Sequence, residues 1–187
     1  ITHQFNYEHK FFEYNQFTVA SAIGDNFVYR FGDTFLTRGI NDQVRYSKMY
    51  NKIGAIYENT TLGKFQFFLD DFRYNYYFNS VYIVSNKVIP NLLKDEVNTF
   101  GGQYEYQKNK WKAKLLYSNS ITNQALTNID ASLKYKFNDK NQLDFQYQNM
   151  NKLPNHIYNL HQSSYTNYNW YNDFKNEKIN SINVNAS

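Results

Sequence analysis

The chain has 187 residues, a net charge of +4 and 20% aromatic residues, yet its mean hydropathy of −0.75 is strongly polar. It contains no cysteine, which excludes disulfides and thiolate metal sites. It also contains no run of about 18 apolar residues, so no transmembrane helix is predicted, and its mild charge does not by itself indicate a nucleic-acid partner.

Apolar and polar residues alternate along most of the chain. Successive side chains of a strand point to opposite faces, so each alternating stretch predicts a strand with one apolar and one polar face. Tyr and Phe are abundant and favour strands, whereas the scarcity of helix formers argues against long helices. The nine expected strands are Ile1–Tyr7, Val44–Tyr57, Lys64–Phe78, Thr99–Gln107, Trp111–Ser118, Ile129–Phe137, Leu143–Gln148, Tyr165–Tyr171 and Ile179–Ala186.

The connections between these strands alternate in length. The first connection is long and the second is short. Long and short connections then continue to alternate, except that residues 119–128 form a connection of moderate length in place of a long one. Outer-membrane barrels show this order, with tight turns at one end and longer loops at the other, whereas β-sandwiches mix their loop lengths. The expected connections are residues 12–42, 59–63, 79–96, 108–110, 119–128, 138–141, 149–160 and 172–177, of which 91–96 are helix-like.

The hairpin at residues 129–148 shows the two faces most clearly. Ile129, Ala131 and Leu133 fall on one face, and Asp130 and Lys134 on the other. If the strands form a membrane barrel, the apolar face contacts lipid and the polar face lines a lumen. The residues expected to face lipid are Trp111, Ala113, Leu115, Tyr117, Ile129, Ala131, Leu133, Tyr135, Leu143 and Phe145. Those expected to face the lumen are Asp71, Arg73, Lys112, Lys114, Asp130, Lys134, Lys136 and Asp144.

Lysines outnumber carboxylates among the polar residues of the central hairpins. A lumen lined by them would be basic and would favour anions modestly. Alternatively, the Lys and Asp side chains pair across neighbouring strands and only fill the interior.

Aromatic residues lie near the ends of several expected strands. Amphipathic rings at strand ends are typical of the two interfacial girdles of a membrane barrel, although Tyr and Phe are also simply good strand formers. The expected interface aromatics are Tyr76, Tyr104, Tyr106, Trp111, Phe137, Tyr168 and Trp170.

Two stretches resemble a known family. These are ITHQFNYEHKFFEY at residues 1–14 and QSSYTNYNWYNDFKNEK at residues 162–178. Both are similar to the Putative porin family of Bacteroidetes outer membranes. The resemblance implies an exported outer-membrane β-barrel without a defined enzymatic site. The chain ends NVNAS, without the terminal aromatic usual in such barrels, so we expect an incomplete segment of a larger barrel.

No motif for catalysis or cofactor binding is found. His3 and His9 lie about 20 Å apart if they share a strand, and His156 and His161 have no nearby thiol. Asp70 and Asp71 are neighbours on a strand and should point to opposite faces. Lys112 and Lys114 would face away from Trp111 and Tyr117, which argues against a nucleic-acid stacking platform. No cofactor, metal, nucleic-acid partner or enzymatic activity is expected.

The sequence therefore predicts an all-β, antiparallel, up-and-down transmembrane β-barrel, with residues 1–187 forming one barrel segment of about nine strands. The expected role is a passive diffusion pore, or a structural subunit of an outer-membrane complex, in a Gram-negative bacterium. Its partners would be membrane lipid and further outer-membrane subunits. The alternative is a soluble secreted β-sandwich or β-solenoid that binds glycans through surface aromatics.

Overall fold

The computed structural model describes residues 1–17, 31–36, 39–122 and 124–187 and is almost entirely built of strands. Long strands form one sheet, and short strands lie in its connections. The elements are β1 (Thr2–Gln16), β2 (Ile40–Asn59), β3 (Gly63–Phe78), β4 (Tyr82–Val84), β5 (Lys87–Ile89), β6 (Leu92–Lys108), β7 (Trp111–Ser120), β8 (Thr127–Lys136), β9 (Gln142–Lys152), α2 (His156–Asn159), β10 (Leu160–His161), β11 (Trp170–Tyr171) and β12 (Glu177–Ala186).

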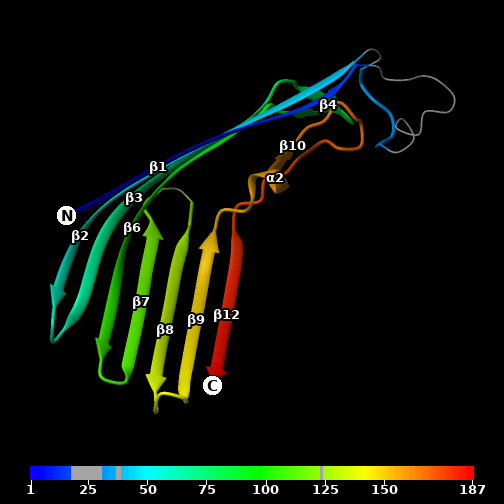
Figure 1. Ribbon diagram of the computed structural model, residues 1–187. Coiled ribbons are helices and arrows are strands. Elements are labelled where there is room, and N and C mark those ends of the chain that lie inside the picture. Colours follow the sequence, from blue (N-terminus) through cyan, green and yellow to red (C-terminus); the bar gives the residue numbers. More distant parts are fainter. Residues whose placement is uncertain (18–30, 37–38, 123) are drawn as a thin grey trace.

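The main sheet has eight antiparallel strands in the order β1-β2-β3-β6-β7-β8-β9-β12. It curves into a trough, with β1 at one edge and β12 at the other (Figure 1). These two edge strands do not pair with each other, so the sheet is open. The predicted all-β antiparallel class is confirmed, and the open, curved sheet is consistent with a partial barrel.

The predicted alternation of short and long connections is confirmed for the main sheet. Residues 60–62, 109–110 and 137–141 form tight turns at one end, called the turn end below. Asn side chains build these turns: Asn59 Oδ1 accepts from the amides of Thr61 and Leu62, and Asn138 Oδ1 accepts from those of Lys140 and Asn141. Such Asx turns explain why short polar stretches reverse the chain here. The longer connections are residues 17–39, 79–91, 121–126 and 153–176, all at the opposite, loop end.

Two expectations about elements are wrong. Residues 91–96 are not helical, because β6 begins at Leu92 and pairs with β3 from Tyr77 onwards. Residues 165–171 do not form a strand of the main sheet. They belong to the connection 153–176, in which Trp170 and Tyr171 pair with β10 and Tyr165 forms an isolated bridge with Thr34. The main sheet therefore has eight strands rather than nine, and residues 172–177 are not a hairpin turn.

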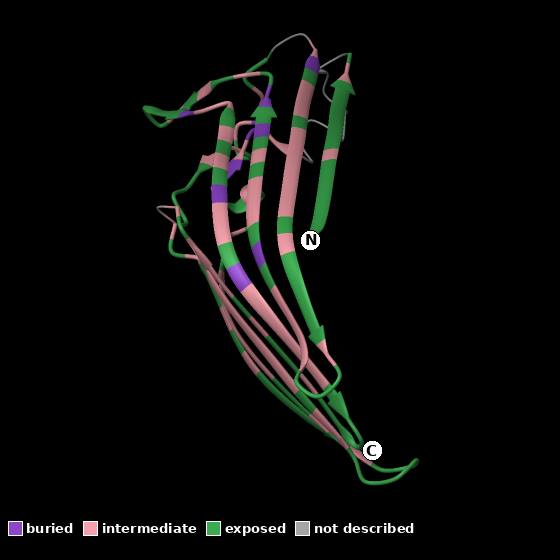
Figure 2. Cartoon of the chain, turned by 90° about the vertical axis from the view of Figure 1, so that its left-hand side faces the viewer, coloured by how far each residue is buried: buried purple, intermediate pink, exposed green. Residues whose placement is uncertain are grey.

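Buried side chains are few, and most of them lie in the loop-end half of the molecule (Figure 2). An exception is Phe68 of β3, which is 6% exposed and lies nearer the turn end. A small core joins Tyr76 and Phe78 of β3, Ile89 of β5 and Leu160 of β10. The turn-end half consists of a single sheet layer with no apolar layer packed on it among the described residues. A sandwich core, which needs two packed sheets, is not seen there.

Candidate functional site

The ladder register decides which side chains share a face. Directly paired residues point to the same side of a sheet. The pairs Lys112–Lys134, Lys114–Ser132, Lys134–Asp144, Lys136–Gln142 and Asp130–Gln148 place six of the expected lumen residues on one face. Segment 153–176 packs against Tyr46 and Tyr76 of the same face, within the hollow of the trough (Figure 1). We therefore call this the concave face.

Asp71 and Arg73 lie on the other, convex face, so the prediction that they share a surface with Lys112 is wrong. Asp71 pairs with Asn98 of β6, and Asn98 shares its face with Tyr104, which pairs with Leu115. On the convex face Arg73 Nε lies 3.0 Å from Asp71 Oδ1 and an Arg73 Nη lies 3.1 Å from Glu96. This ion-pair cluster sits in the loop-end half of long strands.

The convex face is divided along the strand direction. Its turn-end half carries apolar side chains with no protein layer over them, such as Phe67, which is 66% exposed. Its loop-end half carries more polar and charged residues, among them Arg45, Asp71 and Glu96, next to the exposed Phe11, Tyr77 and Leu92. All ten residues expected to contact lipid lie on this face in the turn-end half. We call the apolar turn-end half the apolar band. It also includes Phe5, Ile53, Ala55, Phe67, Leu69, Phe100, Ile182 and Val184.

An aromatic row runs across the convex face at the turn end. Ring centroids are 4.6 Å apart for Phe65 and Tyr104, 4.5 Å for Trp111 and Tyr135, and 4.9 Å for Tyr135 and Phe137. Four of the expected interface aromatics, Tyr104, Tyr106, Trp111 and Phe137, lie in this row. Tyr57 and Phe65 also lie in this row and were not predicted as interface aromatics, although both flank the tight turn at residues 60–62 and have the alternation expected for this face.

Three other expected interface aromatics lie elsewhere, so their assignment is wrong. Tyr76 is only 6% exposed and sits in the small core on the concave face. Tyr168 and Trp170 belong to segment 153–176, where Trp170 packs at a tilt against His161 with ring centroids 4.6 Å apart and Tyr168 meets Tyr165 edge to face. All three pack against protein rather than at a strand end of the convex face.

Charges on the concave face are balanced and partly paired. Lys134 lies 3.7 Å from Asp144, and Glu105 lies 4.0 Å from both Lys64 and Lys114. Within β7–β9 five lysines face two carboxylates, and four of these lysines, Lys112, Lys114, Lys134 and Lys136, lie toward the turn end, which leaves a local positive excess there. Over the eight strands the register gives nine lysines and nine carboxylates. They are Lys10, Lys48, Lys52, Lys64, Lys112, Lys114, Lys134, Lys136 and Lys152, with Glu8, Asp42, Glu58, Asp70, Asp95, Glu105, Asp130, Asp144 and Glu177.

Segment 153–176 is fastened to the sheet by polar contacts as well as by Leu160. Asp42 of β2 accepts hydrogen bonds from Ser163 Oγ, Ser164 Oγ and the Ser164 amide at 3.1, 2.5 and 2.8 Å. Gln162 Nε2 donates to the carbonyls of Ile89 and Pro90 at 2.9 and 2.6 Å. The segment thus has a fixed position in the trough at the loop end, where it narrows any passage along the concave face.

Two histidines of this segment are half-buried against aromatic rings. His156 lies between Tyr46 and Tyr76, with ring centroids 4.6 and 4.3 Å away. Burial lowers the pKa of His156, and the nearby Lys10 lowers it further. Burial also lowers the pKa of His161, although Asp42 acts in the opposite direction. Both imidazoles are therefore neutral at pH 7.

The four histidines do not converge. His3 and His9 lie in β1 on the convex face, whereas His156 and His161 lie in the docked segment. Asp70 and Asp71 point to opposite faces as predicted, and Asp70 accepts from Thr99 Oγ1 on the concave side. Over the described ranges, no three His, Cys, Asp or Glu side chains gather closely enough to hold a metal ion.

No helix within the described part of the chain is long and apolar enough to cross a membrane. No curated protein and no solved structure matches the chain. A family model described as "Putative porin" matches residues 1–187, the entire chain. The matched length, the single antiparallel sheet and the division into a polar concave and an apolar convex face agree with one another, and the chain belongs to the Putative porin family.

Proposed function

We propose that this chain forms part of a β-barrel in the outer membrane of a Gram-negative bacterium and serves there as a passive diffusion pore. The observation that carries the proposal is the pair of unlike faces on one sheet layer. An apolar band without a protein cover is costly in water because large exposed apolar patches favour association or lipid contact. Lipid around the convex side would cover the band and leave the concave side for water.

The dimensions of the band support this arrangement. A strand rises about 3.3 Å per residue and tilts about 40° in a barrel, which gives about 2.5 Å of height per residue. The ten residues of β8 would then span about 25 Å, the height of the lipid-facing band of outer-membrane barrels. The aromatic row would lie at one boundary of the hydrocarbon layer.

The long strands extend beyond such a band. β2 has 20 residues, β3 has 16 and β6 has 17, so their loop-end halves would project out of the membrane. The charged convex residues Arg45, Arg73 and Glu96 lie on those halves, which accounts for their exposure. Since tight turns are periplasmic and long loops external in such barrels, the docked segment would lie at the external mouth.

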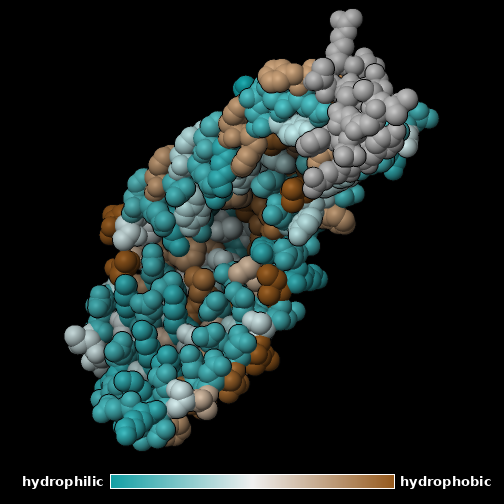
Figure 3. Space-filling model, turned by 45° about the vertical axis from the view of Figure 1, so that its right-hand side comes forward, coloured by the Kyte–Doolittle hydropathy of each residue, from teal (hydrophilic) through white to brown (hydrophobic). Residues whose placement is uncertain are grey.

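The seen faces of the molecule agree with a water-lined interior. When the molecule is turned so that the right-hand side of Figure 1 comes forward, its surface is mostly hydrophilic around a hollow, and hydrophobic side chains lie along the edges and within the hollow (Figure 3). A structural subunit of an outer-membrane complex would share this surface. The difference would be that such a subunit conducts no ions by itself.

Two measurements test the proposal: first the extraction of the protein from the membrane fraction, and then its ion conductance. The protein should stay in the membrane fraction in 1 M salt or alkaline carbonate and dissolve only in detergent. It should then show heat-modifiable migration in a gel and conduct ions in planar bilayers. Release by salt alone would refute the membrane proposal and favour a soluble β-protein. Detergent-dependent extraction without conductance would refute the pore and leave the structural subunit.

A further inference from the structure

Charged side chains that face each other directly across the strand ladders are of opposite sign in nearly every case. Directly paired side chains have Cβ atoms about 5 Å apart, so opposite charges stabilise such a pair and like charges destabilise it. The directly paired residues of opposite charge in the described strands are Glu8–Lys48, Lys52–Asp70, Glu58–Lys64, Lys64–Glu105, Arg73–Glu96, Glu105–Lys114, Lys134–Asp144 and Lys152–Glu177. The exception within these strands is Lys112 of β7, which faces Lys134 of β8. The ladder gives Lys112 no carboxylate, because its other direct neighbour is the neutral Gln107.

Four lysines lie together around this exception, at the turn end of the concave face. They are Lys112, Lys114, Lys134 and Lys136, called the lysine cluster below. Each of them is exposed or half-buried, so their ammonium groups can be reached from the concave side. Residues two apart on a strand are separated by about 7 Å, and the long, flexible lysine side chains can therefore converge on one small anion.

Two carboxylates neutralise only part of the lysine cluster. Asp144 lies 3.7 Å from Lys134, and Glu105 lies 4.0 Å from Lys114. The other two lysines of the cluster have no carboxylate within ion-pair distance in the parts of the chain that the structure describes. Four lysines and two carboxylates leave an excess of two positive charges, which complements the charge of about −1.5 to −2 that a phosphate monoester carries at pH 7.

A hollow of about 410 Å³ adjoins the lysine cluster at the turn end. Lys112 and Lys114 line it together with Glu105, and the neutral hydrogen-bonding side chains of Asn59 and Gln107 form further parts of its wall. The volume lies within the range of small-molecule sites. Because this wall is polar, it suits a solute that carries hydroxyl groups next to its charged group.

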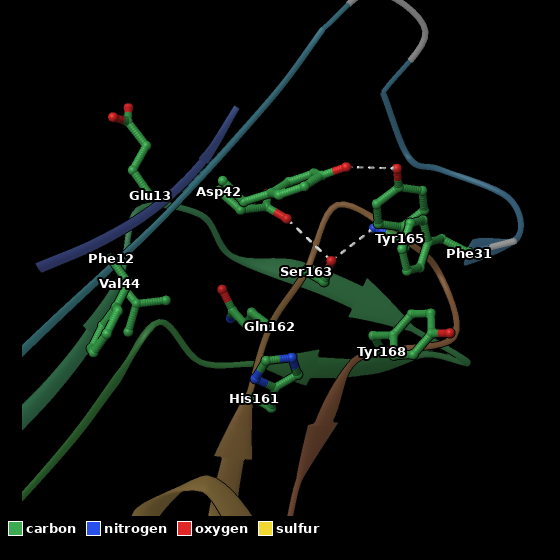
Figure 4. A pocket seen from close by; sticks show the side chains of 11 residues that line it. Phe12, Glu13, Phe31, Asp42, Val44, His161, Gln162, Ser163, Tyr165 and Tyr168 are labelled. Carbon is green, nitrogen blue, oxygen red and sulfur yellow. Dashed lines mark hydrogen bonds between the residues drawn. The ribbon is translucent and has the colours of Figure 1, made fainter. Parts of the chain in front are cut away.

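The hollow at the loop end provides a comparison. It has a volume of about 350 Å³ and lies between β1, β2 and the docked segment (Figure 4). Its carboxylate Asp42 accepts hydrogen bonds from Ser163 and Ser164, so this charged group is already engaged within the protein. At the turn end, by contrast, ammonium groups of the lysine cluster stay available to a ligand.

We propose that the lysine cluster and the adjoining hollow form a binding site for a small phosphate monoester, such as a sugar phosphate. The phosphate oxygens would accept hydrogen bonds from Lys112, Lys134 and Lys136 and would offset the repulsion between the two facing lysines. The inference rests on the proposed function, because it gives the pore a preferred class of solute near its turn-end mouth. Binding itself requires no conductance, so either proposal can fail without the other.

The experiment uses the full chain in a phosphate-free detergent and follows the ³¹P resonance of glucose 6-phosphate. We expect saturable line broadening with Kd on the order of 1 mM at low salt. The affinity should fall several-fold in about 0.5 M KCl, because salt screens exposed charges. Glucuronate and glucose are added as competitors. The singly charged glucuronate should compete about tenfold more weakly than inorganic phosphate, and neutral glucose should not compete.

Two variants test the lysines that have no carboxylate partner. Lys112→Gln and Lys136→Gln should each weaken the binding of glucose 6-phosphate about three- to tenfold, the effect of one lost charged hydrogen bond at an exposed site. The matched control is Lys152→Gln, since Lys152 lies on the same face but at the loop end of β9, where it pairs with Glu177 at 3.4 Å. It should bind as the parent does.

Urea unfolding provides a readout that a general loss of charge would not produce. Without phosphate, Lys112→Gln should unfold at a higher urea concentration than the parent, because it removes the repulsion with Lys134. Lys152→Gln loses a pair of opposite charges and should show no such gain. Added glucose 6-phosphate should then raise the unfolding midpoint of the parent more than that of Lys112→Gln.

Several results would overturn the proposal. These are no saturable broadening up to about 50-fold the expected Kd, glucuronate competing as well as inorganic phosphate, or equal affinity of Lys112→Gln and Lys152→Gln. A short-chain phosphatidic acid that binds at least about tenfold more tightly than glucose 6-phosphate would assign the site to a lipid headgroup instead. In a Trp111→Phe background, a change in Trp170 fluorescence with the same Kd would place the ligand at the loop end, because Trp170 packs against His161 of the loop-end hollow.

Conductance separates this inference from the proposed function. Binding of the ester without any conductance would refute the pore and keep the site. Conductance without binding would keep the pore and refute the site. If both hold, glucose 6-phosphate should reduce the KCl current saturably, with the same Kd as in the ³¹P titration.

Discussion

Three adjacent positions of β8 give a sharp test of which face meets lipid. Ala131 and Leu133 lie on the convex face within the apolar band, and Ser132 between them lies on the concave face. Arginine at each position adds the same charge to the same strand, and Ala131→Arg and Ser132→Arg also add nearly the same volume. The difference between those two variants therefore reports on the surroundings of the two faces rather than on strand propensity.

The expected losses of unfolding free energy follow from the height of each position above the aromatic row. Ala131 is four residues from Tyr135 along β8, or about 10 Å in height, which places it close to the midplane of a band about 25 Å tall. Leu133 is two residues from Tyr135, or about 5 Å in height. Ala131→Arg should cost about 2–4 kcal/mol of unfolding free energy, Leu133→Arg about 1–3 kcal/mol, and Ser132→Arg less than about 0.5 kcal/mol.

The assay is urea-induced unfolding of the chain in phospholipid vesicles, followed by tryptophan fluorescence and by heat-modifiable gel migration. Lys134→Gln on the concave face serves as a second control and should have almost no effect. Equal costs at positions 131 and 132 would refute the assignment of the convex face to lipid. A larger cost at 132 than at 131 would mean that the two faces are inverted.

Three further predictions concern packing, pH and ion selectivity. A Cβ at Gly101 would overlap the Phe68 ring and lie 2.6 Å from the Tyr117 carbonyl oxygen; Gly101→Ala should therefore lower the unfolding free energy by about 1–3 kcal/mol. Gly102→Ala is the control, because its nearest atom would be 3.6 Å away, and an equal loss in urea titrations would contradict this packing. Since the docked state lowers the pKa values of His156 and His161, the undocked state binds more protons, and docking should weaken as the pH falls below about 6.5. Trp170 fluorescence should report this transition, and a His156→Gln, His161→Gln double variant should lose it while His9→Gln keeps it; a transition unchanged in the double variant would exclude these histidines. The excess of lysines in β7–β9 predicts a weak anion preference, seen as a reversal potential across a KCl gradient and reduced at high salt. Lys112→Glu with Lys136→Glu should reverse it, and cation preference in the parent would contradict the prediction.

The sequence by itself determined the strands, their two faces and the order of turns and loops. These features are local, because alternation fixes the faces of one strand and residues such as Asn59 and Asn138 build tight turns from their own neighbours. Across a tight turn the register follows from the turn, so Lys134 and Asp144, which lie on either side of the turn at residues 137–141, could be placed on one face correctly. The aromatic row at the turn end could be located for the same reason.

Only the tertiary structure decided how strands joined by a long connection are aligned and which distant segments pack together. The 13 residues between β3 and β6 leave their relative register open, since a shift by one residue exchanges the faces, and this is why Asp71 and Arg73 were placed on the wrong face. The docking of segment 153–176 likewise depends on contacts such as Ser164 with Asp42, 122 residues apart in the chain. The alternation along one stretch contains no information about such distant partners. The pattern therefore predicts strand-end aromatics at Tyr76, Tyr168 and Trp170, although these residues pack inside the trough.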